Sequence, residues 1–325
     1  MNGVLDTAGE RLAIEYSLPW VGELIEEGSA GELQRIDVDD ASLRVYVEAE
    51  SAPFRTAGWR LLSRGAWHRN GEVVLHNVCT AGFDLHFRRR AEWTEFTYRW
   101  RPPTRDRLAA RLLRSRFHLL ARAVLMQYPA LWWAGTRGRS PLHASACTAG
   151  NAVPLVTGPS GVGRSTLLLD ELERGGAATG DNIAVGDGTT VWGLVEPVRV
   201  EGSGGRRMPH GRGEVPMRNR AAALVPDRLV VLERRPGEET SLSPCSPATA
   251  ARALVTSTYM AGELRRFWAF AATLAAGSDV GPPHPPVADV AAGFAARLAC
   301  FALVLGSEPP RLAETLSSIE VAAWA

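Results

Sequence analysis

One short stretch of the chain limits its fold more than any other: two apolar segments, joined by three residues, run directly into a glycine-rich loop. The segments are 142–148 and 152–157, and the loop is Gly158-Pro-Ser-Gly-Val-Gly-Arg-Ser165. A three-residue connection can join only antiparallel strands, because parallel strands need a crossover of about a dozen residues or more. The sequence therefore predicts a hairpin whose second strand feeds the loop.

The loop has Walker A spacing, in which Gly-x-x-x-x-Gly precedes a basic residue and a Ser or Thr. Glycines let the backbone curl so that successive amide N–H groups point at one anion, and the N-terminus of a following helix adds partial positive charge. Leucines at helical spacing and Gly175-Gly176 predict that helix over 164–174. The residues predicted to hold nucleotide phosphates are Gly158, Pro159, Ser160, Gly161, Val162, Gly163, Arg164, Ser165 and Thr166.

Arg164 stands where Walker A sequences have lysine. A guanidinium is planar and bulkier than an ammonium, so it can bind phosphate bidentately and yet misplace it for transfer. All 36 Lys or Arg residues of this chain are arginine, so the substitution follows a bias of the whole sequence. The sequence leaves open whether Arg164 supports catalysis or abolishes it. Ser165 is expected to ligate Mg²⁺ through its hydroxyl.

Composition narrows the functional classes. The net charge of +1 gives no general attraction to nucleic acid or to an anionic membrane. The four cysteines form no C-x-x-C pair, which indicates free thiols in a reducing compartment. The N-terminus lacks the order of a signal peptide, and the apolar stretch 119–133 is interrupted by Arg122 and Pro129. We expect a cytoplasmic protein without nucleic-acid or membrane partners.

The first 128 residues predict a β-rich N-terminal domain. Alternating apolar and polar residues predict a small antiparallel sheet that ends at Pro102-Pro103, and Asn70-Gly71 predicts a hairpin turn. The predicted strands are 36–38, 43–47, 59–67, 72–78, 83–87 and 96–100.

A single amphipathic helix over 105–128 is predicted to link the two domains. Its apolar positions are Leu108, Leu112, Leu119, Ala123 and Met126. The arginines on its other side indicate either a solvated face at a domain seam or a surface for an acidic partner.

Residues 129–325 predict a second, mixed domain. Its expected elements after the loop and helix are a strand over 191–200, a Gly- and Arg-rich loop over 203–220, a buried strand over 228–233, a helix within 248–276, an extended break over 281–286 and helices from about residue 288. Glu233, at the end of a strand, is either structural or a Walker B-like carboxylate.

From about residue 141 to 235 the chain resembles the HPr kinase/phosphorylase family, which shares its core with PEP carboxykinases. Leu142-His143 resembles the L-H pair of that family, and 157–165 resembles its T-G-x-S-G-x-G-K-S run. The helix ending in Arg174-Gly175 and the strand ending in Leu232-Glu233 are similar as well, and Gly180-Asp181-Asn182 stands where the family has A-D-D.

The resemblance implies an α/β fold with α+β elements, in which an HPr kinase/PEP carboxykinase-like P-loop domain (129–325) follows the β-rich domain (1–128), which would recruit the acceptor. It implies a kinase dependent on Mg²⁺ and ATP, or on GTP or pyrophosphate. The acceptor would be a hydroxyl of a peptide, a protein or a small molecule, in a biosynthetic pathway. Relatives are often oligomers, so a homo-oligomer is implied too.

The same resemblance assigns roles to individual residues. Asp181 matches the first aspartate of a pair that binds Mg²⁺ and takes the proton of the acceptor hydroxyl. Asn182, at the second position, can ligate Mg²⁺ but cannot be the base. His143 is either close to the transferred phosphate, where it is an alternative to Asp181 as the base, or a core histidine. Arginines 206, 207, 218 and 220 near His210–Glu214 either neutralise phosphate or lie in a solvated loop.

Two further functions remain open at this point. The substitutions at Arg164 and Asn182 point to a nucleotide-binding pseudokinase with a regulatory role. An ATPase, with water as the phosphoryl acceptor, is the other alternative.

Overall fold

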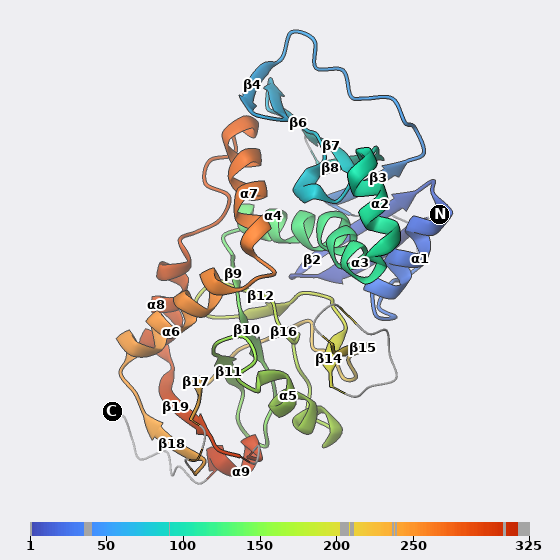
Figure 1. Cartoon of the computed structure of the whole chain (residues 1–325). Helices are drawn as coiled ribbons and strands as arrows, with labels where there is room; N and C mark the ends of the chain where they lie inside the picture. Colours follow the sequence, from blue (N-terminus) through green and yellow to red (C-terminus); the bar gives the residue numbers. More distant parts are fainter. Residues whose placement is uncertain are drawn as a thin grey trace. The chain divides into compact units, whose positions relative to one another are not determined.

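The computed structural model describes residues 2–35, 41–90, 92–201, 208, 211–235, 237, 239–307 and 310–317. Contacts divide the chain into two compact units (Figure 1). The first unit is Met1–Gly138, Glu201–Val215 and Arg265–His284, and the second is Arg139–Val200, Pro216–Leu264 and Pro285–Ala325. The sequence pattern placed one boundary near residue 128, whereas each of these units combines three separate segments. Helices and strands are mixed in the chain, which agrees with an α/β fold with α+β elements.

The first unit contains an eight-stranded sheet among the described residues, in the order β1-β2-β3-β8-β7-β6-β5-β4. The strands are β1 (Asn2–Thr7), β2 (Glu10–Tyr16), β3 (Leu43–Glu48), β4 (Arg60–Ser63), β5 (Ala66–Arg69), β6 (Glu72–Leu75), β7 (Phe83–Arg89) and β8 (Thr94–Trp100). The prediction of a purely antiparallel sheet is wrong, because β3 pairs in parallel with both β2 and β8. Helix α1 (Pro19–Gly28) lies in the long connection from β2 to β3, which makes the parallel pairing possible.

The predicted hairpin turn is confirmed. Asn70 and Gly71 have φ angles of 51° and 77° and join the antiparallel pair β5 and β6. The predicted strand 59–67 is instead a second hairpin of β4 and β5, which turns at Gly65 with φ 82°. The sheet ends at Trp100, before the two prolines, as predicted. The strand predicted over 36–38 lies outside the described residues.

The single linking helix is a wrong prediction. The segment forms α2 (Thr104–Leu112), α3 (Arg114–Arg122), a π-helical turn (Ala123–Gln127) and α4 (Tyr128–Thr136). Leu113, at φ −114° and ψ 53°, leaves helical geometry and separates α2 from α3. The apolar stripe is not buried at its start, since Leu108 and Leu112 are 56% and 72% exposed. Arg122, in contrast, is buried and forms a two-bond ion pair with Glu214 of the same unit.

The second unit contains two sheets in its described part. The larger has the order β10-β11-β17-β19-β18, and the smaller has the order β16-β13-β12-β9. The strands are β9 (Ser140–Leu142), β10 (Ala144–Ala146), β11 (Pro154–Thr157), β12 (Ala184–Gly186), β13 (Val191–Gly193), β16 (Ala223–Leu224), β17 (Arg228–Arg234), β18 (Ser241–Pro244) and β19 (Ala299–Leu305). The predicted antiparallel hairpin is confirmed in β10 and β11, and the buried strand 228–233 is confirmed as β17, parallel to β11.

Three predictions about the later chain need correction. The strand predicted over 191–200 is split into β13 and β14 (Val198–Val200). The helix within 248–276 is two helices, α6 (Pro247–Met260) in the second unit and α7 (Arg265–Ser278) in the first. Helix α8 (Val287–Arg297) begins where predicted, but buried β19 follows it, and then α9 (Leu312–Ser317). The seven-residue apolar run of β19 fills the sheet between β17 and β18.

Another short strand, β15 (Gly213–Val215), lies inside the loop that was predicted over 203–220. No helix in the described part of the chain is long and apolar enough to cross a lipid bilayer. The four cysteines are free, as predicted, and Cys147 and Cys300 are buried.

Candidate functional site

The glycine-rich loop connects β11 to helix α5 (Arg164–Glu173), the arrangement that the sequence predicts. Gly161 and Gly163 have φ angles of 82° and 118°, in a region that disfavours side chains. A Cβ on Gly158 would lie 2.9 Å from the carbonyl oxygen of Leu232 on β17, so the loop starts close against the neighbouring strand. Glycine is therefore required at these positions by backbone geometry.

The main-chain amides of the loop are largely open. One turn closes within it, where the amide of Val162 donates to the carbonyl of Pro159 at 3.2 Å. Pro159, Ser160 and Gly161 are exposed. The other amides donate to no acceptor among the residues that the structure describes: Ser160, Gly161, Gly163, Arg164, Ser165 and Thr166. Such unsatisfied donors at the start of a helix favour an anion.

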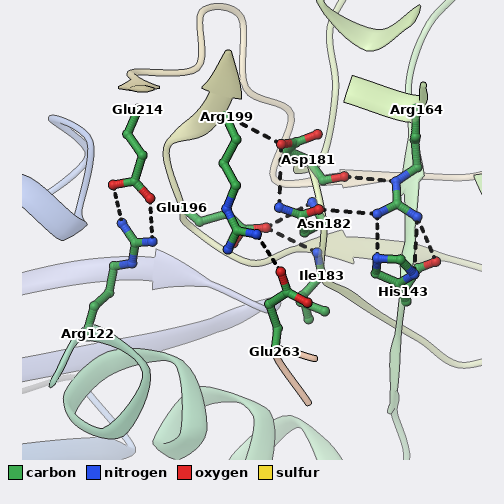
Figure 2. A network of polar contacts seen from close by, with 10 residues as sticks. All are labelled: Arg122, His143, Arg164, Asp181, Asn182, Ile183, Glu196, Arg199, Glu214 and Glu263. Carbon is green, nitrogen blue, oxygen red and sulfur yellow. Dashed lines mark hydrogen bonds and ion pairs between the residues drawn. The ribbon is translucent and has the colours of Figure 1, made fainter. Parts of the chain in front are cut away.

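The side chain of Arg164 turns inward from the loop and is only 6% exposed (Figure 2). Its Nε donates to the carbonyl oxygen of Asp181 at 3.2 Å, and its Nη1 donates to the carbonyl oxygen of His143 at 3.1 Å. Its Nη2 lies 2.8 Å from Nε2 of His143 and 3.3 Å from Oδ1 of Asn182. Burial lowers the pKa of Arg164, and nearby carboxylates act against this shift. The guanidinium is therefore fixed by hydrogen bonds to other residues of the protein.

The protonation state of His143 follows from this contact. A guanidinium only donates hydrogen bonds, so Nε2 of His143 accepts from Arg164 and Nδ1 carries the proton. That proton points to Oγ of Ser257 at 2.6 Å, and Ser257 donates in turn to the carbonyl of Gly158 at 2.7 Å. Burial, followed by the charge of Arg164, lowers the pKa of His143 to about 3. His143 is neutral here, and the lone pair that a general base needs is occupied.

Asp181 is completely buried and only partly satisfied. Its Oδ2 accepts hydrogen bonds from the backbone N–H of Arg199 at 3.3 Å and from the side-chain Nδ2 of Asn182 at 3.5 Å. Its Oδ1 has no hydrogen-bond partner in the described part of the chain. A buried carboxylate oxygen without a donor is rare in folded proteins. This oxygen is free to take a metal ion or a proton donor.

Four residues that the sequence did not predict complete this polar cluster: Glu196, Arg199, Ser257 and Glu263. Glu196 accepts the backbone N–H groups of Asn182 and Ile183 at 2.9 and 3.1 Å, which fixes the turn that carries Asp181. Arg199 pairs with Glu263. Burial opposes this charge, but Arg199 outweighs it and lowers the pKa of Glu263. No local sequence pattern indicates these residues, since Arg199 is on β14, Ser257 is in α6, and Glu196 and Glu263 lie in loops.

The side-chain oxygens at this site supply part of the ligand set that one Mg²⁺ needs beside a nucleotide. No group of three or more His, Cys, Asp or Glu that could hold a metal is found among the described residues. Magnesium at nucleotide sites needs only one or two carboxylates together with phosphate oxygens. Asp181 offers a free oxygen, and Ser165 is half-buried at the start of α5. The side-chain amide oxygen of Asn182 already accepts a hydrogen bond from Arg164, so it is less available as a metal ligand.

The remaining candidates lie elsewhere or are engaged. Glu233 accepts a hydrogen bond from Arg235 at 2.8 Å. Arg220 donates to the carbonyl of Gly193 at 3.1 Å. Arg206, Arg207 and His210 lie outside the described residues.

Comparison with known proteins does not assign the chain to a family. No model of a known protein family matches the chain, and no curated protein sequence matches it. The functional argument therefore depends on the site itself.

Proposed function

We propose that the second unit binds the polyphosphate of a nucleotide, first of all ATP with Mg²⁺, on the loop from Gly158 to Thr166. The observation that carries this proposal is the set of open amides between β11 and α5. Left-handed glycines and a helix N-terminus, both present here, are features that favour convergence of such donors on one anion. The resemblance to the HPr kinase/phosphorylase family supports the same site.

We propose further that the bound nucleotide phosphorylates a hydroxyl of a peptide, a protein or a small molecule. The acceptor oxygen would bond to the γ-phosphorus as the bond to the β,γ-bridging oxygen breaks, and ADP would leave. Asp181 would take the proton of the hydroxyl, because His143 has no free lone pair. Bound Mg²⁺ would neutralise charge on the phosphates, with Asp181 and Ser165 as protein ligands.

Binding without transfer is the second candidate, and one observation favours it. The cation that normally reaches the phosphates is buried against His143 and Asn182. Asp181 is also completely buried, so an acceptor hydroxyl reaches it only after the cluster opens. In this case the chain would be a nucleotide-binding regulator.

Helix α2 is our candidate for acceptor recruitment in the first unit. None of its nine residues is buried, and Leu108 and Leu112 expose large apolar surface. Arg107 and Arg111 are exposed on the same helix. A basic helix with exposed leucines suits a peptide that combines acidic and apolar residues.

One assay separates these functions. The intact chain is incubated with γ-labelled ATP, Mg²⁺ and either candidate acidic peptides or cell extract. Label on an acceptor supports the kinase, and free labelled phosphate supports an ATPase. Nucleotide binding with neither product supports the regulator, and absence of nucleotide binding would overturn the whole proposal.

A further inference from the structure

The inward turn of Arg164 leaves the glycine-rich loop without a cation of its own. Arg164 and Arg199 lie within a cluster that contains Asp181, Glu196 and Glu263, so two positive charges face three carboxylates there. We propose that Arg234, at the end of β17, supplies the positive charge that binds the nucleotide phosphates. This inference rests on the proposed nucleotide site and names a residue that Walker A spacing does not include.

The geometry of β17 directs Arg234 toward the loop. Leu232 lies directly beneath the start of the loop, since its own Cβ would be 3.0 Å from a Cβ on Gly158. Side chains two residues apart on a strand lie on the same face, so Arg234 shares that face with Leu232. Its Nη2 lies 3.7 Å from the position of a Cβ on Gly163, the residue that caps α5. Arg234 is therefore a close neighbour of the open amides.

Arg234 is also free to bind an anion. Its side chain is exposed and makes no hydrogen bond or ion pair within the described part of the chain. Its neighbours are Glu233, on the other face of β17, and Arg235, just after the strand ends, and these two pair with each other at 2.8 Å. Arg235 thus provides a matched control, one position away, with a partner already in place.

A second observation, at Asp181, points to a ligand beside the loop. Asp181 is fully buried, and its Oδ1 has no donor among the described residues. The carbonyl of the same residue accepts Nε of Arg164, the first residue of α5. A polyphosphate bound on the loop with Mg²⁺ would account for the unpaired oxygen, because Asp181 would help hold the metal while Arg234 contacts the phosphate.

The test compares three variants of the intact chain, Arg234→Ala, Arg234→Lys and Arg235→Ala. Titration calorimetry with Mg·ATP, and separately with inorganic tripolyphosphate, gives the affinity of each. Arg234→Ala should weaken binding of both by about ten- to a hundredfold, the effect of one lost charge-assisted hydrogen bond. Arg234→Lys should recover part of the loss, and Arg235→Ala should bind like the wild type.

Thermal unfolding without ligand checks that Arg234→Ala folds, and its Tm should match that of the wild type because the side chain is exposed. If Arg234→Ala binds both probes as tightly as the wild type, the role of Arg234 is overturned, but the proposed nucleotide site is not. Equal losses in Arg234→Ala and Arg235→Ala would also overturn it, since they indicate general electrostatics. A wild-type chain that binds neither probe would overturn both the role and the site.

Discussion

The glycine-rich loop and the polar cluster behind it differ in how their polar groups are satisfied. The loop presents amides that have no acceptor in the described chain. The cluster consists of side chains that hold one another, with Arg164 at its centre. The difference teaches that the backbone and the basic side chain of a loop with Walker A spacing can have separate roles. Its backbone remains available to a ligand, while its basic side chain holds neighbouring loops together.

The largest expected effect concerns Asp181, whose Oδ1 has no hydrogen-bond partner among the described residues. An amide oxygen still ligates Mg²⁺, so Asp181→Asn should retain Mg·ATP affinity within a few fold. It should lower phosphoryl transfer by about a hundredfold or more, because the proton acceptor is lost. Single-turnover assays with labelled ATP measure this. Asp170→Asn, on the exposed side of α5, is the control and should transfer at the wild-type rate. Full activity in Asp181→Asn would remove Asp181 from the mechanism.

Removal of the Arg164 side chain should destabilise the folded state more than it alters the glycine-rich loop. Arg164→Ala should lower the free energy of unfolding by about 3–5 kcal/mol, because buried carboxylates lose their counter-charge. Urea unfolding measures the loss. Arg174→Ala, on an exposed pair of the same helix, should unfold like the wild type. If Arg164→Ala is equally stable, the cluster is not structural.

The neutral state of His143 predicts a pH dependence. Its pKa is about 3 in the folded chain, below its usual value of 6.5, so the unfolded chain binds more protons between these pH values. Stability from this group is complete above about pH 6.5 and falls as the pH falls toward 3. From pH 7.5 to 5 the wild type should lose about 2 kcal/mol that His143→Gln does not lose. Equal pH slopes in urea unfolding would contradict this account.

The smallest expected effect is found by comparing a serine of the polar cluster with a serine of the loop. Ser257→Ala should lower the free energy of unfolding by about 1–2 kcal/mol, because Nδ1 of His143 and the carbonyl of Gly158 lose their buried partner. Ser160→Ala, in the exposed loop, should unfold like the wild type. Chemical unfolding of both variants gives the contrast, and similar losses would mean that loop and cluster are equally packed.

Local patterns predicted the parts of the site that are close in sequence. The hairpin β10–β11, the loop and α5 follow from connection length, glycine spacing and leucine periodicity. Strand β17 follows from its apolar run. These features depend on neighbouring residues only, so a single sequence is enough to read them.

The other parts depend on distant partners. Glu196 and Glu263 reach the cluster from loops and Ser257 from α6, and no periodicity connects them with Arg164. The inward turn of Arg164 depends on His143, which is 21 residues away in sequence. The parallel pairing of β3 has the same origin, since its partner β8 is distant in sequence. Nothing in the structure explains the break at Leu113, which is 50% exposed.

Titration of the ¹⁵N-labelled chain with Mg·ATP, followed through its backbone amide resonances, tests the central claim most directly. The account predicts that the largest shifts belong to Gly161, Gly163, Arg164 and Ser165, whose N–H groups would bond to phosphate oxygens. Saturating nucleotide that leaves these resonances in place, or that shifts only residues elsewhere in the chain, would contradict it.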